Sequence, residues 1–177
     1  MHLPGIIWEL YHLSLGGRCK ILVAQLSKAM IEIREGNIED IPEVFKLIKE
    51  LAVYEDGLHQ VINTEELMRK DGFGPHPIYG LIVAEVNKEI IGSAIYYYRY
   101  STWKGKRMYL EDLIVTEAER GNGVGKLLFD EVLKVAKKTN CTGMMWQVLD
   151  WNEPAINFYK KYDSNFDEEW INCNIDF

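Results

Sequence analysis

Apolar and polar residues change their spacing several times along the chain, and each spacing predicts one element. Residues 30–34 alternate between the two kinds, as in a strand with one buried face. Helical spacing follows from Ile41 to Leu51, with Asp40 at the expected N-cap ahead of Pro42. A strand followed at once by an amphipathic helix is the usual opening of an α/β domain.

The middle of the chain predicts another helix and then three antiparallel strands. The helix begins at Thr64, whose hydroxyl can cap its first turn. Residues 78–86 and 90–100 are rich in β-branched and aromatic side chains, and the polar Asn-Lys-Glu between them indicates a hairpin. Residues 107–115 are the third predicted strand, after the loop STWKGK.

The last third of the chain predicts, in order, a helix over 121–138, a strand over 143–150, a helix over 152–162 and a strand over 168–177. The predicted fold class is α/β in the wider sense that includes α+β, with a mixed, mostly antiparallel sheet flanked by helices.

Two segments differ in their pattern. The predicted single domain covers residues 30–177. Residues 1–29 lack its regular spacing, and we expect them to be a dispensable N-terminal extension.

Composition narrows the possible partners. A chain of 177 residues with 47% hydrophobic and 27% charged residues can bury one core as a soluble globular domain. Its net charge of −7 argues against nucleic acid and suits a cationic substrate, although solubility alone explains the charge equally well. No stretch approaches the roughly 18 unbroken apolar residues of a membrane span. Three widely spaced cysteines without a nearby histidine pair predict no metal site and a cytoplasmic location.

Three glycines stand within five positions where the third strand gives way to the long helix, in the sequence RGNGVG of residues 120–125. Backbone amides at a helix N-terminus are unpaired and attract anions, and glycine lets a ligand approach them closely. A P-loop is excluded because Leu127 stands where it needs serine or threonine, and a dinucleotide fingerprint needs glycine in place of Lys126. Another kind of phosphate-binding turn, or a glycine-rich turn without a ligand, remains.

The pattern Arg-x-x-Gly-x-Gly after a strand resembles the acyl-coenzyme A pyrophosphate loop of the GNAT superfamily of N-acetyltransferases. From Met30 to Trp170 the chain is similar to the branch with the diamine (spermidine/spermine) and thialysine N-acetyltransferases. The segments that carry the resemblance are KELAVYED, DGFGPHPIYG, IYYYRYSTWKG, YLEDLIV, RGNGVG and WNEPAINFYKK. It implies a GNAT fold and acetyl transfer from acetyl-coenzyme A to a primary amine of a small cationic molecule, by direct attack in a ternary complex.

Such a reaction needs a base, because an alkylammonium with a pKa of about 10.4 cannot attack a thioester. The resemblance assigns proton acceptance, through water, to Glu111 and contact with the amine to Asp112. Adjacent strand residues point to opposite faces, so only one of these can face a cleft unless a β-bulge intervenes. Tyr159 matches the general acid that protonates the leaving thiolate, and Phe158 is expected to be the core residue. By themselves these residues also fit solvent-facing carboxylates and a packing tyrosine.

The resemblance further implies that the main chain holds the cofactor. The N–H of Leu113 would stabilise the tetrahedral oxyanion, and this strand would hold the pantetheine arm as if it were a further strand. The implied cofactor-binding residues are Leu113, Ile114, Val115, Arg120, Gly121, Asn122, Gly123, Val124, Gly125, Lys126, Asn152 and Tyr159.

Carboxylates and aromatic faces attract ammonium groups, which is why the resemblance places both kinds of side chain around the amine. The implied substrate-binding residues are Glu55, Trp103, Glu111, Asp112 and Trp170. Two positions depart from the family pattern. Ser101 stands where the diamine enzymes tend to have an acidic residue, which weakens the case for a long polyamine, and Asp163 replaces a helix-closing glycine.

The resemblance also implies a homodimer whose chains lend residues to each other's clefts. Thialysine, lysine-like amines and di- or polyamines stay unranked as substrates. Two alternatives remain open: a protein or peptide lysine acetyltransferase, and a non-catalytic acyl-coenzyme A sensor. A sensor needs neither base nor acid, so the presence of both Glu111 and Tyr159 argues against it.

Overall fold

Five strands form one sheet in the order β1-β2-β3-β4-β5, and the computed structural model describes residues 30–175 of the chain. Neighbours from β1 to β4 are antiparallel, whereas β5 runs parallel to β4. The strands are β1 (Glu32–Glu35), β2 (Gly80–Val86), β3 (Glu89–Ser101), β4 (Gly105–Val115) and β5 (Met144–Met145). The α-helices are α2 (Ile41–Tyr54), α3 (Glu65–Phe73), α4 (Val124–Lys138) and α5 (Glu153–Tyr159). The short 3-10 helices are η1 (Ile38–Asp40), η2 (Leu58–Gln60), η3 (Glu117–Glu119) and η4 (Lys160–Tyr162).

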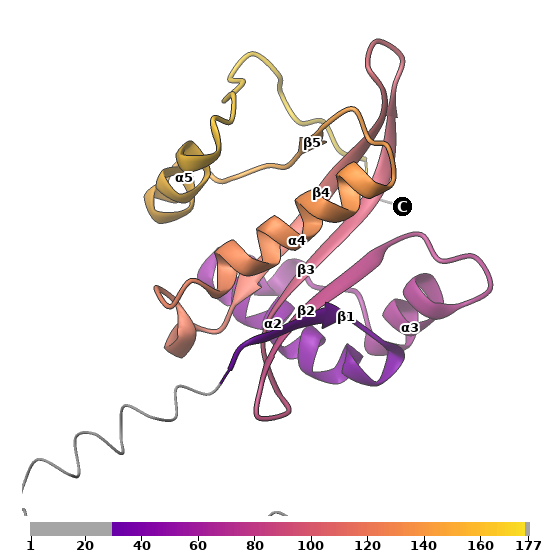
Figure 1. Ribbon diagram of the computed structural model, residues 1–177, viewed down its shortest axis with the longest axis vertical. Helices are drawn as coiled ribbons and strands as arrows, with labels where there is room; N and C mark the ends of the chain where they lie inside the picture. The colour runs from indigo at the N-terminus through magenta and orange to yellow at the C-terminus, as the bar shows by residue number, and fades with distance from the viewer. Residues whose placement is uncertain (1–29, 176–177) are drawn as a thin grey trace, which may run out of the picture.

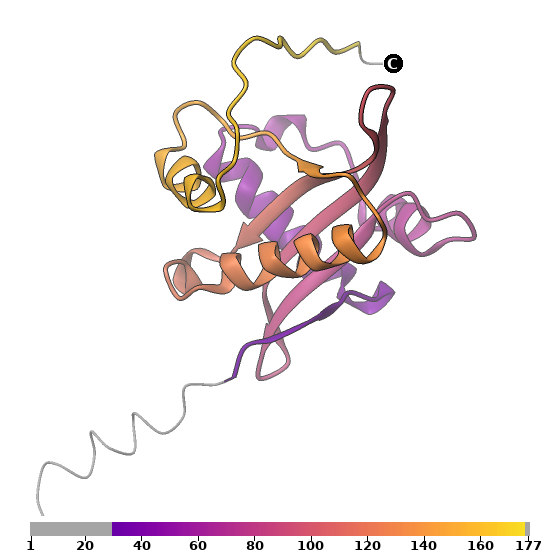
Figure 2. The same cartoon turned by 45° about the horizontal axis from the view of Figure 1, so that its top comes forward.

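Helices cover both faces of the sheet, as the sequence predicts (Figure 1). α4 crosses one face, and α2 lies behind the other, which Figure 2 shows with α4 in front. The core on the α4 face includes Ile82, Ala94, Met108, Leu128, Phe129 and Val132. The core on the α2 face includes Ile41, Val44, Phe45, Leu81, Val83 and Ile95. Strand residues alternate between these two cores, so the sheet is apolar on both sides where helices cover it.

Local sequence explains the hairpin between β2 and β3. Asn87 and Lys88 both have positive φ angles, 52° and 71°, as a two-residue hairpin turn requires. The start of α3 also follows the sequence, because the Thr64 side chain accepts a hydrogen bond of 3.2 Å from the Leu67 N–H. Both predictions are confirmed.

Asp40 has a different role from the expected one. It stands at the N-cap of α2, but its carboxylate makes no capping hydrogen bond to that helix. Instead the carboxylate accepts hydrogen bonds of 2.7 and 2.9 Å from Arg34 on β1 and one of 2.8 Å from the Asn37 N–H. Arg34 also donates to Glu85 on β2, so these charges tie the first helix to the sheet edge.

Strand predictions near the end of the chain were wrong. β5 spans two residues instead of 143–150, and it pairs only with Met108 and Tyr109 of β4. Residues 168–175 form no strand. An apolar pattern makes a strand only where a neighbouring strand pairs with its backbone. The pairing of β4 with β5 ends at Tyr109 and Met145, so the residues after Met145 do not continue the strand.

The long helix starts later than predicted. Gly121 and Gly123 have φ angles of +79° and +86°, which no helix allows, so α4 begins at Val124. Residues 1–29, the expected extension, lie outside the described part of the chain, as do residues 176–177.

Candidate active site

A β-bulge lies where the sequence places two adjacent carboxylates. In the β3–β4 register Ile95 pairs with Asp112 and the next residue, Tyr96, pairs with Leu110, so Glu111 is an extra residue on β4. Leu110 remains on the α4 face, in the core with Tyr96, while Asp112 stands opposite Ile95 of the α2-face core. The bulge that the sequence left open is therefore present.

Two other carboxylates, those of Glu111 and Glu55, act on Asp112 at the α2 face. Burial raises the pKa of Asp112 to about 6, helped by the negative charges of Glu111 and Glu55. Glu55 is the C-cap residue of α2, and burial raises its pKa as well. Within residues 30–175 none of the three makes an ion pair with lysine or arginine. A cluster of like charges without a cation partner favours binding of a cation.

The edge of β4 next to this cluster is open on the side of β5. β5 pairs only as far as Tyr109, so within residues 30–175 the predicted cofactor segment, residues 110–115, has a neighbouring strand only in β3. Leu113, Ile114 and Val115 pair there with Ala94, Ser93 and Gly92. The unpaired edge offers backbone donors and acceptors to an extended ligand, as the sequence interpretation requires.

The glycine-rich loop, residues 120–125, presents free amides at the start of α4. Gly123 is the N-cap, no side chain in the described part of the chain caps the helix, and the first turn of α4 carries no acidic residue. In the described backbone the first N–H with a partner is that of Leu127, which donates to Gly123. Among the atoms of residues 30–175, a Cβ at Gly121 or Gly123 would meet nothing within 4 Å, and one at Gly125 would meet only Val115 at 3.7 Å. The loop therefore has the open space and unpaired donors that a pyrophosphate needs.

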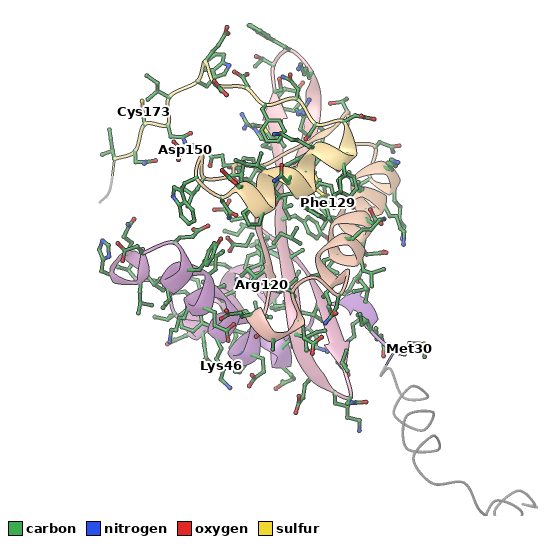
Figure 3. All side chains as sticks on the ribbon, turned by 90° about the vertical axis from the view of Figure 1, so that its left-hand side faces the viewer. Met30, Lys46, Arg120, Phe129, Asp150 and Cys173 are labelled. Carbon is green, nitrogen blue, oxygen red and sulfur yellow. The ribbon has the colours of Figure 1, made fainter. Side chains whose placement is uncertain are left out.

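The two predicted cations of the loop are engaged by the protein. Arg120 donates from Nε to the Val115 carbonyl at 3.0 Å, and its guanidinium lies 5.1 Å from the centroid of the Tyr54 ring. Figure 3 shows Arg120 on the side of the loop toward α2. Lys126 pairs with Asp130 one turn further along α4. Asn122 donates to Glu119 at 3.1 Å.

Asn152 begins α5 and links it to α2. Its Oδ1 accepts a hydrogen bond of 3.2 Å from the Ala155 N–H and one of 3.5 Å from the Tyr54 hydroxyl. The Asn152 side-chain NH2 group makes no hydrogen bond to the described residues and can donate to other partners. Tyr54, which the sequence interpretation did not single out, contacts both the glycine loop and α5.

Tyr159, the expected general acid, is more buried than its neighbour Phe158, which was expected to be the core residue. It is buried, with 7% of its surface exposed, and its ring packs on Phe129, Trp146 and Phe158. Phe158 is only partly buried, so the expectation that it alone is the core residue was wrong. Burial raises the pKa of Tyr159 to about 12, which keeps the phenol protonated and able to donate at neutral pH.

Both predicted substrate tryptophans are exposed, and Trp103 lies too far along the β3–β4 hairpin to reach the carboxylates of its own chain. Trp103 is 88% exposed at the tip of the β3–β4 hairpin, and Trp170 is 78% exposed on the segment after α5. Glu111 lies six positions along β4 from Gly105, at the base of this tip, which is about 20 Å at the usual strand rise.

Sequence reasoning missed the aromatic neighbours of Glu111. Tyr97 and Tyr109 pair across β3 and β4 and stack with ring centroids 5.1 Å apart. Both rings stand on the α2 face, and Tyr109 lies two residues before Glu111 on β4. The signal was the run of four tyrosines over 96–100, but their faces depend on the register of the hairpin, which the pattern does not fix.

Metal-ligand clusters and membrane-spanning helices are both absent from the described residues. Residues 30–175 contain no group of three or more His, Cys, Asp or Glu side chains arranged to hold a metal ion. In the same part of the chain no helix has the length and apolarity to cross a membrane.

Known proteins resemble this chain in sequence and fold. The acetyltransferase (GNAT) family matches residues 42–163. Thialysine N-epsilon-acetyltransferase of Mus musculus is 37% identical over 159 residues, which cover 84% of this chain and 94% of that protein. Spermidine/spermine N(1)-acetyltransferase-like protein 1 of Homo sapiens is 36% identical over 156 residues, which cover 82% of this chain and 22% of that protein.

Among solved structures, an aminoglycoside acetyltransferase from an uncultured soil metagenomic sample shares the fold at 18% identity. Its TM-score is 0.69, over 83% of this chain and 96% of that chain. The matched region, 42–163, contains the bulged carboxylates, the open edge of β4 and the glycine loop. The chain belongs to the acetyltransferase (GNAT) family, whose members use acetyl-coenzyme A as co-substrate, and it is an N-acetyltransferase.

Proposed function

We propose that this chain transfers the acetyl group of acetyl-coenzyme A to a primary amine of a small cationic molecule, by direct attack in a ternary complex. The observation that carries the proposal is the bulge at Glu111. It brings two adjacent carboxylates into one cluster with Glu55, next to the open edge of β4. A base, a cation site and a slot for an extended cofactor thereby adjoin one another.

In the amine half of the site, Asp112 and Glu55 hold the ammonium group. A bound cation offsets the repulsion among the carboxylates, so substrate binding and ionisation of Asp112 favour each other. Glu111 accepts one proton from the ammonium through a water molecule and leaves a nitrogen lone pair. The lone pair can then attack the thioester.

In the thioester half, the nitrogen forms a bond to the carbonyl carbon, and the Leu113 N–H donates to the oxyanion. When the intermediate collapses, the C–S bond breaks and the Tyr159 phenol gives its proton to the thiolate sulfur. The nitrogen loses a second proton to solvent, Glu111 releases to solvent the proton that it accepted, and Tyr159 regains one from solvent. The products are an acetamide, a free thiol and one proton.

The cofactor supplies the activated acetyl group and is bound mainly by backbone. The amides of residues 123–126 hold the pyrophosphate, while the edge of β4 at Leu113 and Val115 holds the pantetheine arm. Arg120 leaves the Val115 carbonyl and Lys126 leaves Asp130 when the phosphates offer a stronger charge. The side-chain amide of Asn152 is a further donor.

Thiol release from acetyl-coenzyme A tests the proposal. The panel contains lysine, thialysine, 1,5-diaminopentane, spermidine and a lysine peptide. We expect release with a small amine, and the relatives named for thialysine and Ser101 both favour a lysine-like one. Release with the peptide alone would favour a protein acetyltransferase. Cofactor binding without release by any amine would favour a sensor and refute the proposal.

Two variants test the assigned roles. Glu111→Gln is expected to lower kcat, most strongly at low pH, where the free amine is scarcest, and Tyr159→Phe to slow turnover with little change in cofactor affinity. Glu66→Gln and Tyr100→Phe, both exposed, are the matched controls. Unchanged rates in both test variants would contradict these roles.

We also propose a homodimer. Trp103 lies at a hairpin tip too far from Glu111 to reach the carboxylates of its own chain, so its expected contact with the amine needs a second copy. Mixing Trp103→Ala with Glu111→Gln chains should restore part of the activity, because one cleft of the mixed dimer keeps both groups. A monomeric mass in light scattering would refute this arrangement.

A further inference from the structure

One face of the β3–β4 hairpin carries opposite charges at its two ends. Asp112 stands at one end, the pair Tyr97–Tyr109 follows, and the pair Arg99–Arg107 comes next. Successive pairs on one face are two residues apart on each strand, apart from the extra bulge residue on β4. Carboxylate, aromatic rings and guanidinium therefore follow one another in that order.

The two tyrosines lie between the charges. Burial raises the pKa of Tyr97, the charge of Glu111 and a hydrogen bond to that carboxylate raise it further, and the charge of Arg99 lowers it. Tyr109 has a raised pKa through burial first, and it too responds to Glu111 and, with the opposite sign, to Arg99. Each phenol is thus close enough to respond to the carboxylate and to the guanidinium.

Arg99 leans back toward the carboxylates. Its guanidinium carbon lies 5.9 Å from the centroid of the Tyr109 ring, and the group also contacts the sulfur of Met145, which pairs with Tyr109. In the described part of the chain Arg99 has no carboxylate partner. Arg107 differs, because it donates to the Met144 carbonyl at 3.1 Å and is held by β5.

We propose that Arg99 binds the carboxylate of an amino-acid substrate whose terminal amine lies at Glu111 and Asp112, and so determines specificity. The inference rests on the proposed function and names its substrate class: lysine-like amino acids in preference to diamines and polyamines. The guanidinium stands at the level of Tyr109, one cross-strand pair, or about 7 Å, from the carboxylate end. An extended lysine side chain separates its amine from its carboxylate by about 7 Å as well.

Charge explains the expected preference. A carboxylate beside Arg99 gains a charge-assisted hydrogen bond. A diamine of the same length instead places a second ammonium near the guanidinium, which repels it. The Tyr97–Tyr109 pair supplies an apolar surface between the two charged ends for the methylene chain.

The test compares lysine with lysine methyl ester and 1,5-diaminopentane, which share its terminal amine but lack its carboxylate. For the wild type we expect kcat/KM to be highest for lysine. Arg99→Met should lower kcat/KM for lysine about tenfold, mainly through KM, as expected for one charge-assisted contact, and leave the diamine unchanged or improved. Arg99→Lys should keep part of the preference. Lys70→Met, an exposed lysine on α3, is the control for loss of one positive charge.

The outcomes separate the inference from the proposed function. If Arg99→Met affects lysine and the diamine by the same factor, or if the wild type prefers the methyl ester, the Arg99 inference is wrong and the acetyltransferase proposal stands. If no amine releases thiol, the proposed function fails. Calorimetric titration of lysine and the diamine into the coenzyme A complex then decides the inference, which requires lysine to bind more weakly to Arg99→Met than to the wild type.

Discussion

Replacing Asp112 with asparagine should stabilise the protein at neutral pH while weakening substrate binding. Burial, Glu111 and Glu55 raise the pKa of Asp112 from 3.8 to about 6 in the folded protein. The folded state therefore prefers the protonated form. The stabilisation from this group is complete below about pH 4 and is lost as pH rises through about 6. Asparagine is neutral at every pH and has no such loss.

The magnitude follows from the shift. About two pKa units at 1.36 kcal/mol each give at most about 3 kcal/mol, reached when Asp112 is fully ionised. For a chain of this length 1 kcal/mol corresponds to about 3 °C in Tm, so the variant should gain up to about 9 °C above pH 7. The difference in Tm should shrink toward zero near pH 4.

Thermal unfolding followed by circular dichroism from pH 4 to pH 8 measures this difference. Asp150→Asn makes the same chemical change at an exposed position and serves as the control. Kinetics of the same variant should show a raised KM for the amine, because asparagine lacks the negative charge that attracts the ammonium group. A Tm difference that does not vary with pH, or a less stable variant at pH 8, would refute the reasoning.

Three further changes test the fold. Arg34→Met should lower the free energy of unfolding by about 2 kcal/mol at pH 7, because the carboxylates of Asp40 and Glu85 lose their partly buried ion-pair partner. Arg34 also lowers the Asp40 pKa, so this stabilisation is present above about pH 4 and is lost as the pH falls further. Urea unfolding measures the difference in unfolding free energy between wild type and variant, and a difference that is unchanged at pH 3 would count against this reason. Ser93→Ala should be neutral or stabilising by up to about 1 kcal/mol, because the buried Ser93 hydroxyl has no hydrogen-bond partner among the described residues. A clear loss of stability in the same assay would reveal such a partner. Gly123→Ala should lower the free energy of unfolding by about 1–2 kcal/mol, because alanine disfavours its φ of +86°, and should raise the KM for acetyl-coenzyme A. Gly125→Ala, at a position without positive φ, should keep the Tm of the wild type. Equal Tm values for the two variants would contradict this.

The sequence by itself determined most elements and the family. Periodicity located α2, α4 and the strands β2 to β4, because each side chain's polarity must match the face on which it stands. The polar Asn-Lys-Glu between two β-rich runs marks the turn at Asn87 and Lys88. The glycine loop with YLEDLIV and WNEPAINFYKK carries the acetyltransferase resemblance. None of these depends on distant parts of the chain.

Pairing between strands decided the rest. Whether Glu111 and Asp112 share a cluster depends on one extra residue in the β3–β4 register, and a one-residue change in register sends a side chain to the other face. The same register aligns Arg99 with the tyrosines and the carboxylates. Residues 143–150 look like a strand, yet only Met144 and Met145 find backbone partners, since a hydrogen-bonded ladder needs two chains. The open edge of β4, and the face that carries Asp112 and Arg99, therefore depend on pairing between strands, which no single segment of the sequence determines.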